Sequence, residues 1–265
     1  MQFVLETILP VQAALKDRFS QANLMLILIN CSVELSQTTG HWFCLILLGW
    51  DECILTPGKR IQMIFELLRL NRGVTDSDFI SIYPEAIKHL DRKHWTPVSI
   101  AKVASEFLVE RPGTKVLDIG SGAGKFCLIG AANTKGHFTG VEQRLELVEL
   151  SQRLSAYYYI RNARFVHANI QSVDFSGYDA FYFYNSFYEN LNPGERIDDA
   201  VRLSSDLYHL YSLHIAEQLA GCRPGTRLVT YCSPTTIVPR SFKLQDSLNG
   251  GLLKFWEKTY STEGR

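Results

Sequence analysis

The chain has 265 residues with 46% hydrophobic and 20% charged residues, which are ordinary values for a globular protein that buries one good core. Its 27 Lys and Arg residues balance 27 Asp and Glu residues, and a formal net charge of +0 argues against a broad nucleic-acid footprint. No apolar run reaches the roughly 18 residues that span a bilayer, and the six cysteines lack metal-ligand spacing, so we expect reduced thiols and a cytoplasmic location.

The chain divides near residue 60. Residues 1–62 have poorly patterned apolar runs, and we expect an N-terminal extension without an assigned role. Met63 opens a better-patterned region, and a shorter product that starts there is a hypothesis for an intact-mass measurement. A helical segment is expected over about 63–112, and the pair Thr96-Pro97 predicts a helix start, with Thr at the N-cap and Pro at the first helical position.

Strands then alternate with helices, which predicts an α/β fold with a parallel sheet and right-handed crossovers. The expected strands are 115–119, 138–142, 164–168, 180–184 and 227–232. The expected helices are 124–132, 145–158 and 195–219. The turn signal Asn249-Gly250-Gly251 separates two further strand candidates, 241–245 and 252–257, and predicts a C-terminal antiparallel hairpin.

The most informative segment is the glycine-rich turn that follows the first of these strands. Gly120, Gly122 and Gly124 alternate, and Asp118 lies two residues before the first of them. Glycine tolerates positive φ and admits a ligand close to the backbone, while the next helix presents free N–H groups. A tight strand-to-helix packing turn is the alternative. The dinucleotide fingerprint G-x-G-x-x-G is not met, because its third glycine would fall at Lys125.

A second acid, Glu142, ends the next strand about 20 residues after the glycines. A carboxylate at this point accepts hydrogen bonds from the ribose hydroxyls of a nucleoside that is bound across the sheet. The alternative is a solvent-exposed glutamate at a strand end. Because dinucleotide-dependent enzymes share this acid, Glu142 supports a nucleoside more than any one cofactor.

Together, the order acid-x-G-x-G-x-G and the following acid resemble the first motifs of the class I S-adenosylmethionine (SAM)-dependent methyltransferases. The resemblance covers roughly residues 94–258. It implies a Rossmann-like, mostly parallel seven-stranded sheet with helices on both faces, a domain over 63–265 with an N-terminal helical lid at about 63–112, SAM as the cofactor, and no metal.

The resemblance also implies roles for individual residues. Asp118 would brace the glycine turn and meet the methionine ammonium. Glu142 would hold the ribose, and Gln143 is a further expected cofactor contact. Asn169, where the family commonly has Asp, would accept from the adenine amino group, and a capping role is its alternative. The remaining expected cofactor contacts are Trp95, Thr96, Gly120, Ser121, Gly122, Gly124 and Ile170.

Strand 180–184 is followed by Asn185-Ser186-Phe187-Tyr188. Asn185 and Tyr188 match the first and fourth positions of the Asp/Asn-Pro-Pro-Tyr/Phe motif of amino-group methyltransferases, whereas Ser186 and Phe187 replace both prolines. The resemblance implies that Asn185 orients a nitrogen acceptor and that Tyr188 offers an aromatic face. An aromatic-rich buried strand with a polar turn is the alternative.

The function predicted from the sequence is methyl transfer from SAM to an unidentified acceptor. A protein side chain or small molecule is favoured over nucleic acid, no membrane partner is expected, and the oligomeric state is open. Two alternatives stay open. One is a catalytically silent SAM-binding or scaffold protein, which the altered strand-end motif allows. The other is an NAD-dependent oxidoreductase, against which Lys125 and the lack of a Tyr-x-x-x-Lys pair count.

Overall fold

A computed structural model describes residues 57–260, so the predictions for residues 1–56 lie outside the described residues. The helices before the sheet are α4 (Pro57–Arg69), α5 (Asp76–Ile80), η1 (Glu85–Leu90), α6 (Asp91–His94) and α7 (Val98–Leu108). The predicted domain boundary at residue 62 falls inside α4. No helix in residues 57–260 has both the length and the apolar character needed to cross a membrane.

Strands and helices then alternate as the sequence predicts. The strands are β1 (Lys115–Ile119), β2 (His137–Glu142), β3 (Ala163–His167), β4 (Ala180–Tyr184), β5 (Arg227–Tyr231), β6 (Phe242–Leu248) and β7 (Leu253–Lys258). The helices between them are α8 (Lys125–Asn133), α9 (Leu145–Tyr157) and α10 (Ser205–Gly221). Short 3-10 turns, η2 to η7, occupy the loops; the two that matter for the site are η4 (Tyr188–Asn190) and η5 (Pro193–Glu195).

The strands form one seven-stranded sheet in the order β3-β2-β1-β4-β5-β7-β6. Strands β1 to β5 pair in parallel, while β7 runs antiparallel to both β5 and β6. The predicted C-terminal hairpin is therefore confirmed. This sheet order and the reversed strand match the fold expected for class I methyltransferases, so the predicted fold class is confirmed.

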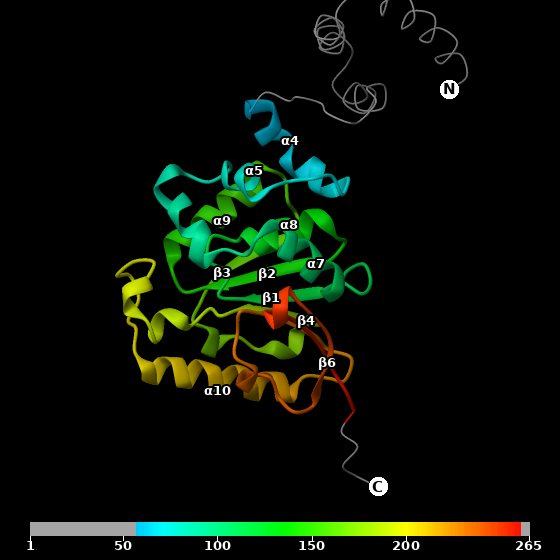
Figure 1. Ribbon diagram of the computed structural model, residues 1–265, viewed down its shortest axis with the longest axis vertical. Coiled ribbons are helices and arrows are strands. Elements are labelled where there is room, and N and C mark those ends of the chain that lie inside the picture. Colours follow the sequence, from blue (N-terminus) through cyan, green and yellow to red (C-terminus); the bar gives the residue numbers. More distant parts are fainter. Residues whose placement is uncertain (1–56, 261–265) are drawn as a thin grey trace, which may run out of the picture. The chain divides into compact units, whose positions relative to one another are not determined.

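Two apolar cores cover the two faces of the sheet, because successive strand side chains point to opposite sides. Val116 joins the core under α7, α8 and α9, whereas Leu117 and Ile119 join the core under α10. Figure 1 shows this layering, with α10 on the side of the sheet opposite α7, α8 and α9. The arrangement leaves the carboxyl ends of the parallel strands as the edge at which loops meet.

The predicted start of α7 is wrong by one residue. Pro97, not Thr96, is the N-cap, and it makes no side-chain capping bond. The Thr96 hydroxyl is instead 2.9 Å from the buried Tyr182 hydroxyl. The free N–H of Val98 donates instead to Asp76 Oδ1 at 2.9 Å. A contact with a residue distant in sequence thus replaces the local cap.

The long helix predicted over 195–219 is wrong in its first ten residues. The helix begins at Ser205, where the Ser204 side chain accepts a hydrogen bond from the N–H of Leu207 at 3.2 Å. The residues before it form the turn η5 and an irregular segment whose backbone N–H groups bind side chains instead of forming helical bonds. That segment lies beside the candidate site.

Candidate functional site

A cleft of about 290 Å³ opens at the carboxyl ends of the parallel strands. Gly120, Glu142, Asn169 and Asn185, which follow or end β1, β2, β3 and β4, all line it. This edge of a doubly wound sheet is where ligands bind, because the loops that leave adjacent strands separate there. We call this space the cleft.

The glycine turn forms one wall of the cleft. Gly120, Gly122 and Gly124 have φ values of 74°, 53° and 77°, which only glycine adopts without strain. A Cβ on Gly120 would lie 2.5 Å from the Ser186 Cβ, whereas a Cβ on Gly122 would meet nothing within 4 Å. Gly120 thus permits close packing between loops, and Gly122 leaves open backbone facing the cleft.

Glu142 points toward this turn. One carboxylate oxygen accepts the N–H of Gly122 at 3.1 Å, and the other accepts the N–H groups of Gln143 at 2.8 Å and Arg144 at 2.9 Å. Burial raises the pKa of the Glu142 carboxyl, and these N–H donors and the nearby guanidinium oppose the increase. The side chain is buried, so the alternative of a solvent-exposed strand-end glutamate is wrong.

Asp118 lies behind the turn rather than in the cleft. Its carboxylate accepts a hydrogen bond from Cys127 Sγ at 3.4 Å, and no cation among the described residues pairs with it. Burial raises its pKa to about 7, and the charge of Glu142 adds to the increase. Asp118 therefore carries its proton more readily than an exposed aspartate.

The end of β3 contributes Asn169 and Ile170 to the cleft wall. Asn169 caps η2 by accepting the N–H of Gln171 at 3.0 Å, and its amide donates to the Tyr211 hydroxyl at 2.8 Å. The capping role that the sequence left open is thus present. Because an amide oxygen has two lone pairs, capping leaves Asn169 able to accept one more hydrogen bond.

The loop after β4 places both predicted acceptor-side residues on the cleft. Asn185 has φ 40°, and its carbonyl accepts the N–H of Tyr188 at 3.0 Å, which closes a turn. Phe187 is buried against Phe183 and Tyr211, with ring centroids 5.3 and 5.2 Å away. The first aromatic of the motif, Phe187, is therefore part of the core, while the second, Tyr188, is 43% exposed at the cleft mouth.

The segment from Lys93 to Trp95 covers another side of the cleft. Trp95 lines it and packs against Tyr83, with ring centroids 4.4 Å apart. Tyr184 donates its hydroxyl to the Lys93 carbonyl at 3.2 Å, which holds this segment to the end of β4. His94, which the sequence analysis left without a role, also lines the cleft, and burial lowers the pKa of its imidazole.

Lys125, which occupies the third glycine position of the dinucleotide pattern, is a buried ion-pair residue. Its Nζ is 2.6 Å from Asp76 and 2.7 Å from Asp91, two residues of the N-terminal helical segment. The contact holds α8, and so the end of the glycine turn, to that segment. Tyr83 adds a hydrogen bond to the Ala123 carbonyl at 3.1 Å.

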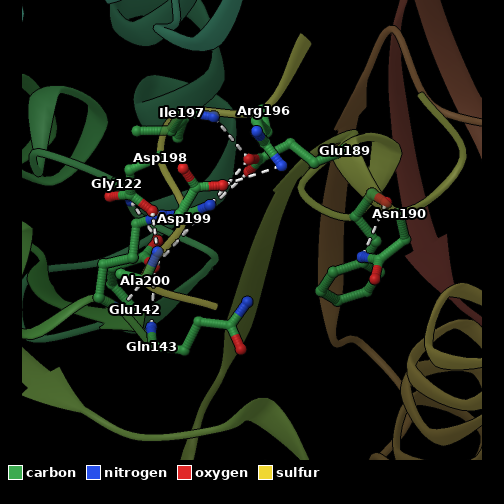
Figure 2. Close-up of polar contacts among 12 residues, drawn as sticks. Gly122, Glu142, Gln143, Glu189, Asn190, Arg196, Ile197, Asp198, Asp199 and Ala200 are labelled. Carbon is green, nitrogen blue, oxygen red and sulfur yellow. Dashed lines mark hydrogen bonds and ion pairs between the residues drawn. The ribbon is translucent and has the colours of Figure 1, made fainter. Parts of the chain in front are cut away.

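A second buried cation, Arg144, connects the end of β2 to the loop after β4. Its guanidinium binds both oxygens of Glu189, at 2.8 and 3.2 Å, and its Nε is 2.9 Å from Asp198. Figure 2 shows Glu189, Asp198, Gln143 and Glu142 drawn together around these contacts. Sequence reasoning missed Arg144 and Glu189 because the two are 45 residues apart and no local pattern joins them.

The structure therefore brings most of the predicted site residues to one place. Those that line the cleft are Trp95, Gly120, Gly122, Glu142, Gln143, Asn169, Ile170, Asn185 and Tyr188. Those that do not line it are Thr96, Asp118, Ser121 and Gly124. Two of the second set pack behind the turn: a Cβ on Gly124 would lie 2.6 Å from the Phe165 ring, and the Ser121 side chain lies against Gly140. Thr96 instead contacts Tyr182.

Comparison with known proteins supports the same interpretation. Residues 110–199 match the family model of a methyltransferase domain, which confirms the resemblance drawn from the motifs. No curated protein matches the chain.

Solved structures with a similar fold have low identity. They include an RNA methyltransferase from Salinibacter ruber in complex with S-adenosyl-L-homocysteine (TM-score 0.46, 16% identity, 64% of this chain and 96% of that one). TrmN from Thermus thermophilus has a TM-score of 0.45 and 19% identity, over 62% of this chain and 49% of that one. The [4+2]-cyclase SpnF has a TM-score of 0.40 and 19% identity, over 50% of this chain and 43% of that one. The chain thus spans less than half the length of the last two.

Proposed function

We propose that this chain, whose residues 110–199 match the family model of a methyltransferase domain, binds SAM in the cleft and transfers its methyl group to a nitrogen acceptor. One observation carries the proposal. The carboxylate of Glu142 lies on the glycine-turn side of the sheet, 3.1 Å from the Gly122 N–H, and lines a cleft that Asn185 also lines.

The residues present fit a nucleoside cofactor. A carboxylate offers about four lone-pair positions, and three backbone donors occupy Glu142, which leaves one for a ribose hydroxyl. The Gln143 side chain lines the cleft beside it and can accept from the second hydroxyl. Asn169 and Ile170 would hold the adenine, and the open backbone at Gly122 admits the ligand.

When bound, SAM supplies a methyl group already activated on a sulfonium. The protein then has to align the acceptor, exclude water and stabilise the positive charge that grows on nitrogen. Asn185 presents its amide at the end of β4, and Tyr188 presents an aromatic face at the cleft mouth. Alignment of this kind is worth roughly 7–11 kcal/mol of the barrier.

Calorimetry with S-adenosylhomocysteine, SAM and NAD tests the cofactor. We expect the first two ligands to bind and NAD not to compete with them. Glu142→Ala should weaken binding by about tenfold or more, the loss of one charged hydrogen bond, while Glu149→Ala, on the exposed face of α9, should leave it unchanged. Unaltered affinity of Glu142→Ala would remove the ribose assignment.

Methyl transfer to panels of amines, proteins and RNA then tests the enzyme. We expect Asn185→Ala to lower turnover about 10- to 100-fold with little change in SAM affinity. A catalytically silent SAM-binding protein is the second candidate. It is favoured by Ser186, whose hydroxyl donates to the Ile119 carbonyl where the family motif has proline. Binding of SAM without transfer to any of the panels would support that candidate.

A further inference from the structure

Arg144 is a buried arginine that connects the end of β2 to the loop after β4. It lies two residues after Glu142, at the start of α9, and its side chain is only 4% exposed. Its backbone N–H donates to Glu142, while its guanidinium reaches Glu189 and Asp198, 45 and 54 residues farther along the chain. One residue thus contacts both Glu142, which is expected to bind the ribose, and the loop after β4.

The loop after β4 depends on these contacts for its conformation. Glu189, held by Arg144, accepts the N–H of Ile197 at 2.8 Å, and Asp198 accepts the N–H of Ala200 at 3.0 Å. Figure 2 shows the labelled carboxylates of Glu189 and Asp198 turned toward this backbone. Residues 196–204 contain no helix or strand, so side chains take the place of a regular hydrogen-bond pattern.

The charge at this point is unbalanced. The single guanidinium faces three carboxylates, with Nη1 3.9 Å from Glu142 and shorter contacts to Glu189 and Asp198. A hydroxyl that donates to Glu142 satisfies part of the charge of that carboxylate. The guanidinium is then held more strongly by the other two carboxylates, since competition for it falls.

We infer that Arg144 is a positioning residue that couples the cofactor site to the acceptor side of the cleft. It holds Glu142 in place for the ribose and holds the loop at 188–204 against the cleft, where Tyr188, Glu195 and Ile197 line the wall. The inference rests on the proposed function. Cofactor binding should therefore order this loop, and by linkage a change in the loop should alter cofactor affinity.

Asp198 provides the sharpest test, because it contacts Arg144 but does not line the cleft. The probe is S-adenosylhomocysteine, measured by calorimetry and by amide hydrogen exchange of the peptide 188–204. In the wild type we expect the ligand to slow exchange in this peptide. We expect Asp198→Asn to lose that protection and to weaken binding by about fivefold or more. Arg144→Lys, which keeps the charge but loses the bidentate geometry, should fall between the two proteins.

Arg196→Gln is the matched control. It removes one charge from the same loop, but Arg196 pairs only with the exposed Asp199 among the described residues. We expect its binding and its exchange protection to equal those of the wild type. The inference is overturned if Asp198→Asn binds and protects like the wild type, or if Arg196→Gln loses as much. A wild type that does not bind S-adenosylhomocysteine refutes the proposed function instead.

Discussion

The two halves of the cleft are built by different means. The side proposed to hold the cofactor, which we call the cofactor half, consists of the ends of β1 and β2 and the glycine turn. Its polar groups bind mainly to nearby backbone, as Glu142 does with Gly122 and Gln143. The side proposed to hold the acceptor, which we call the acceptor half, consists of the loop after β4, and its charged groups bind partners that are distant in sequence, as Glu189 does with Arg144. Backbone hydrogen bonds hold Glu142 in the first half, whereas buried charge holds Glu189 in the second.

The two halves also differ in how buried charge is compensated. Among residues 57–260, the side chain of Asp118 has only a thiol as its hydrogen-bond donor, and its pKa rises to about 7. Around Arg144 three carboxylates share one cation. The cofactor half can therefore lose its excess charge by binding a proton at Asp118. The acceptor half instead depends on the permanent charge of Arg144, because arginine stays protonated.

The largest expected effect follows from removing the buried cation Arg144, with Lys125 as the comparison. Arg144→Met should lower the free energy of unfolding by about 3–5 kcal/mol, because it leaves the buried carboxylates Glu142 and Glu189 unpaired. Lys125→Met should cost less, about 1–3 kcal/mol, because its partners Asp76 and Asp91 are 42% and 21% exposed and water can solvate them. Urea unfolding measures both values. Equal losses would mean that the exposure of the partners is not what separates the two sites.

This contrast explains what the sequence could reveal. Strand 115–119, the glycine turn and Glu142 lie close together in the chain, and their pattern is enough to predict their positions. The helix predicted from 195 failed because the backbone of 196–204 binds Glu189, Asp198 and Asn190 instead of itself. The predicted capping role of Thr96 is wrong because its hydroxyl forms a hydrogen bond with the Tyr182 hydroxyl, which is distant in sequence. Pairings over 45 or 86 residues have no local signature.

The next effect concerns pH and the cofactor half. The folded state raises the pKa of Asp118 from 3.8 to about 7, so the folded protein binds this proton more tightly than the unfolded chain. Stability from this group is therefore fully present below about pH 4 and is lost as the pH rises through 7. Between pH 5 and pH 8 the wild type should lose about 2–3 kcal/mol that Asp118→Asn does not lose.

Urea unfolding of the two proteins across this pH range measures the difference between them. Glu142 also has a raised pKa and is present in both proteins, so the part of its contribution that is due to its own burial cancels. Its coupling to the Asp118 charge is lost in the variant and belongs to the measured difference. Because Asn keeps an oxygen acceptor for the Cys127 thiol, the substitution preserves the shape of the site. Parallel pH dependence of wild type and variant would show that Asp118 titrates as an ordinary exposed aspartate.

The smallest effect tests whether the glycine turn is as local as its sequence pattern suggests. Gly124 and Gly225 have similar positive φ values, 77° and 83°, so alanine meets the same backbone strain at both. Their surroundings differ: a Cβ on Gly124 would lie 2.6 Å from the Phe165 ring and 2.8 Å from Ser151 Oγ, whereas one on Gly225 would meet nothing within 4 Å. Gly124→Ala should therefore cost about 1–3 kcal/mol more than Gly225→Ala in urea unfolding, the usual loss from overpacking. If both variants lose the same free energy of unfolding, backbone strain alone explains why glycine is needed in the turn. The expected larger loss for Gly124→Ala would show that packing against β3 and α9 also requires glycine there.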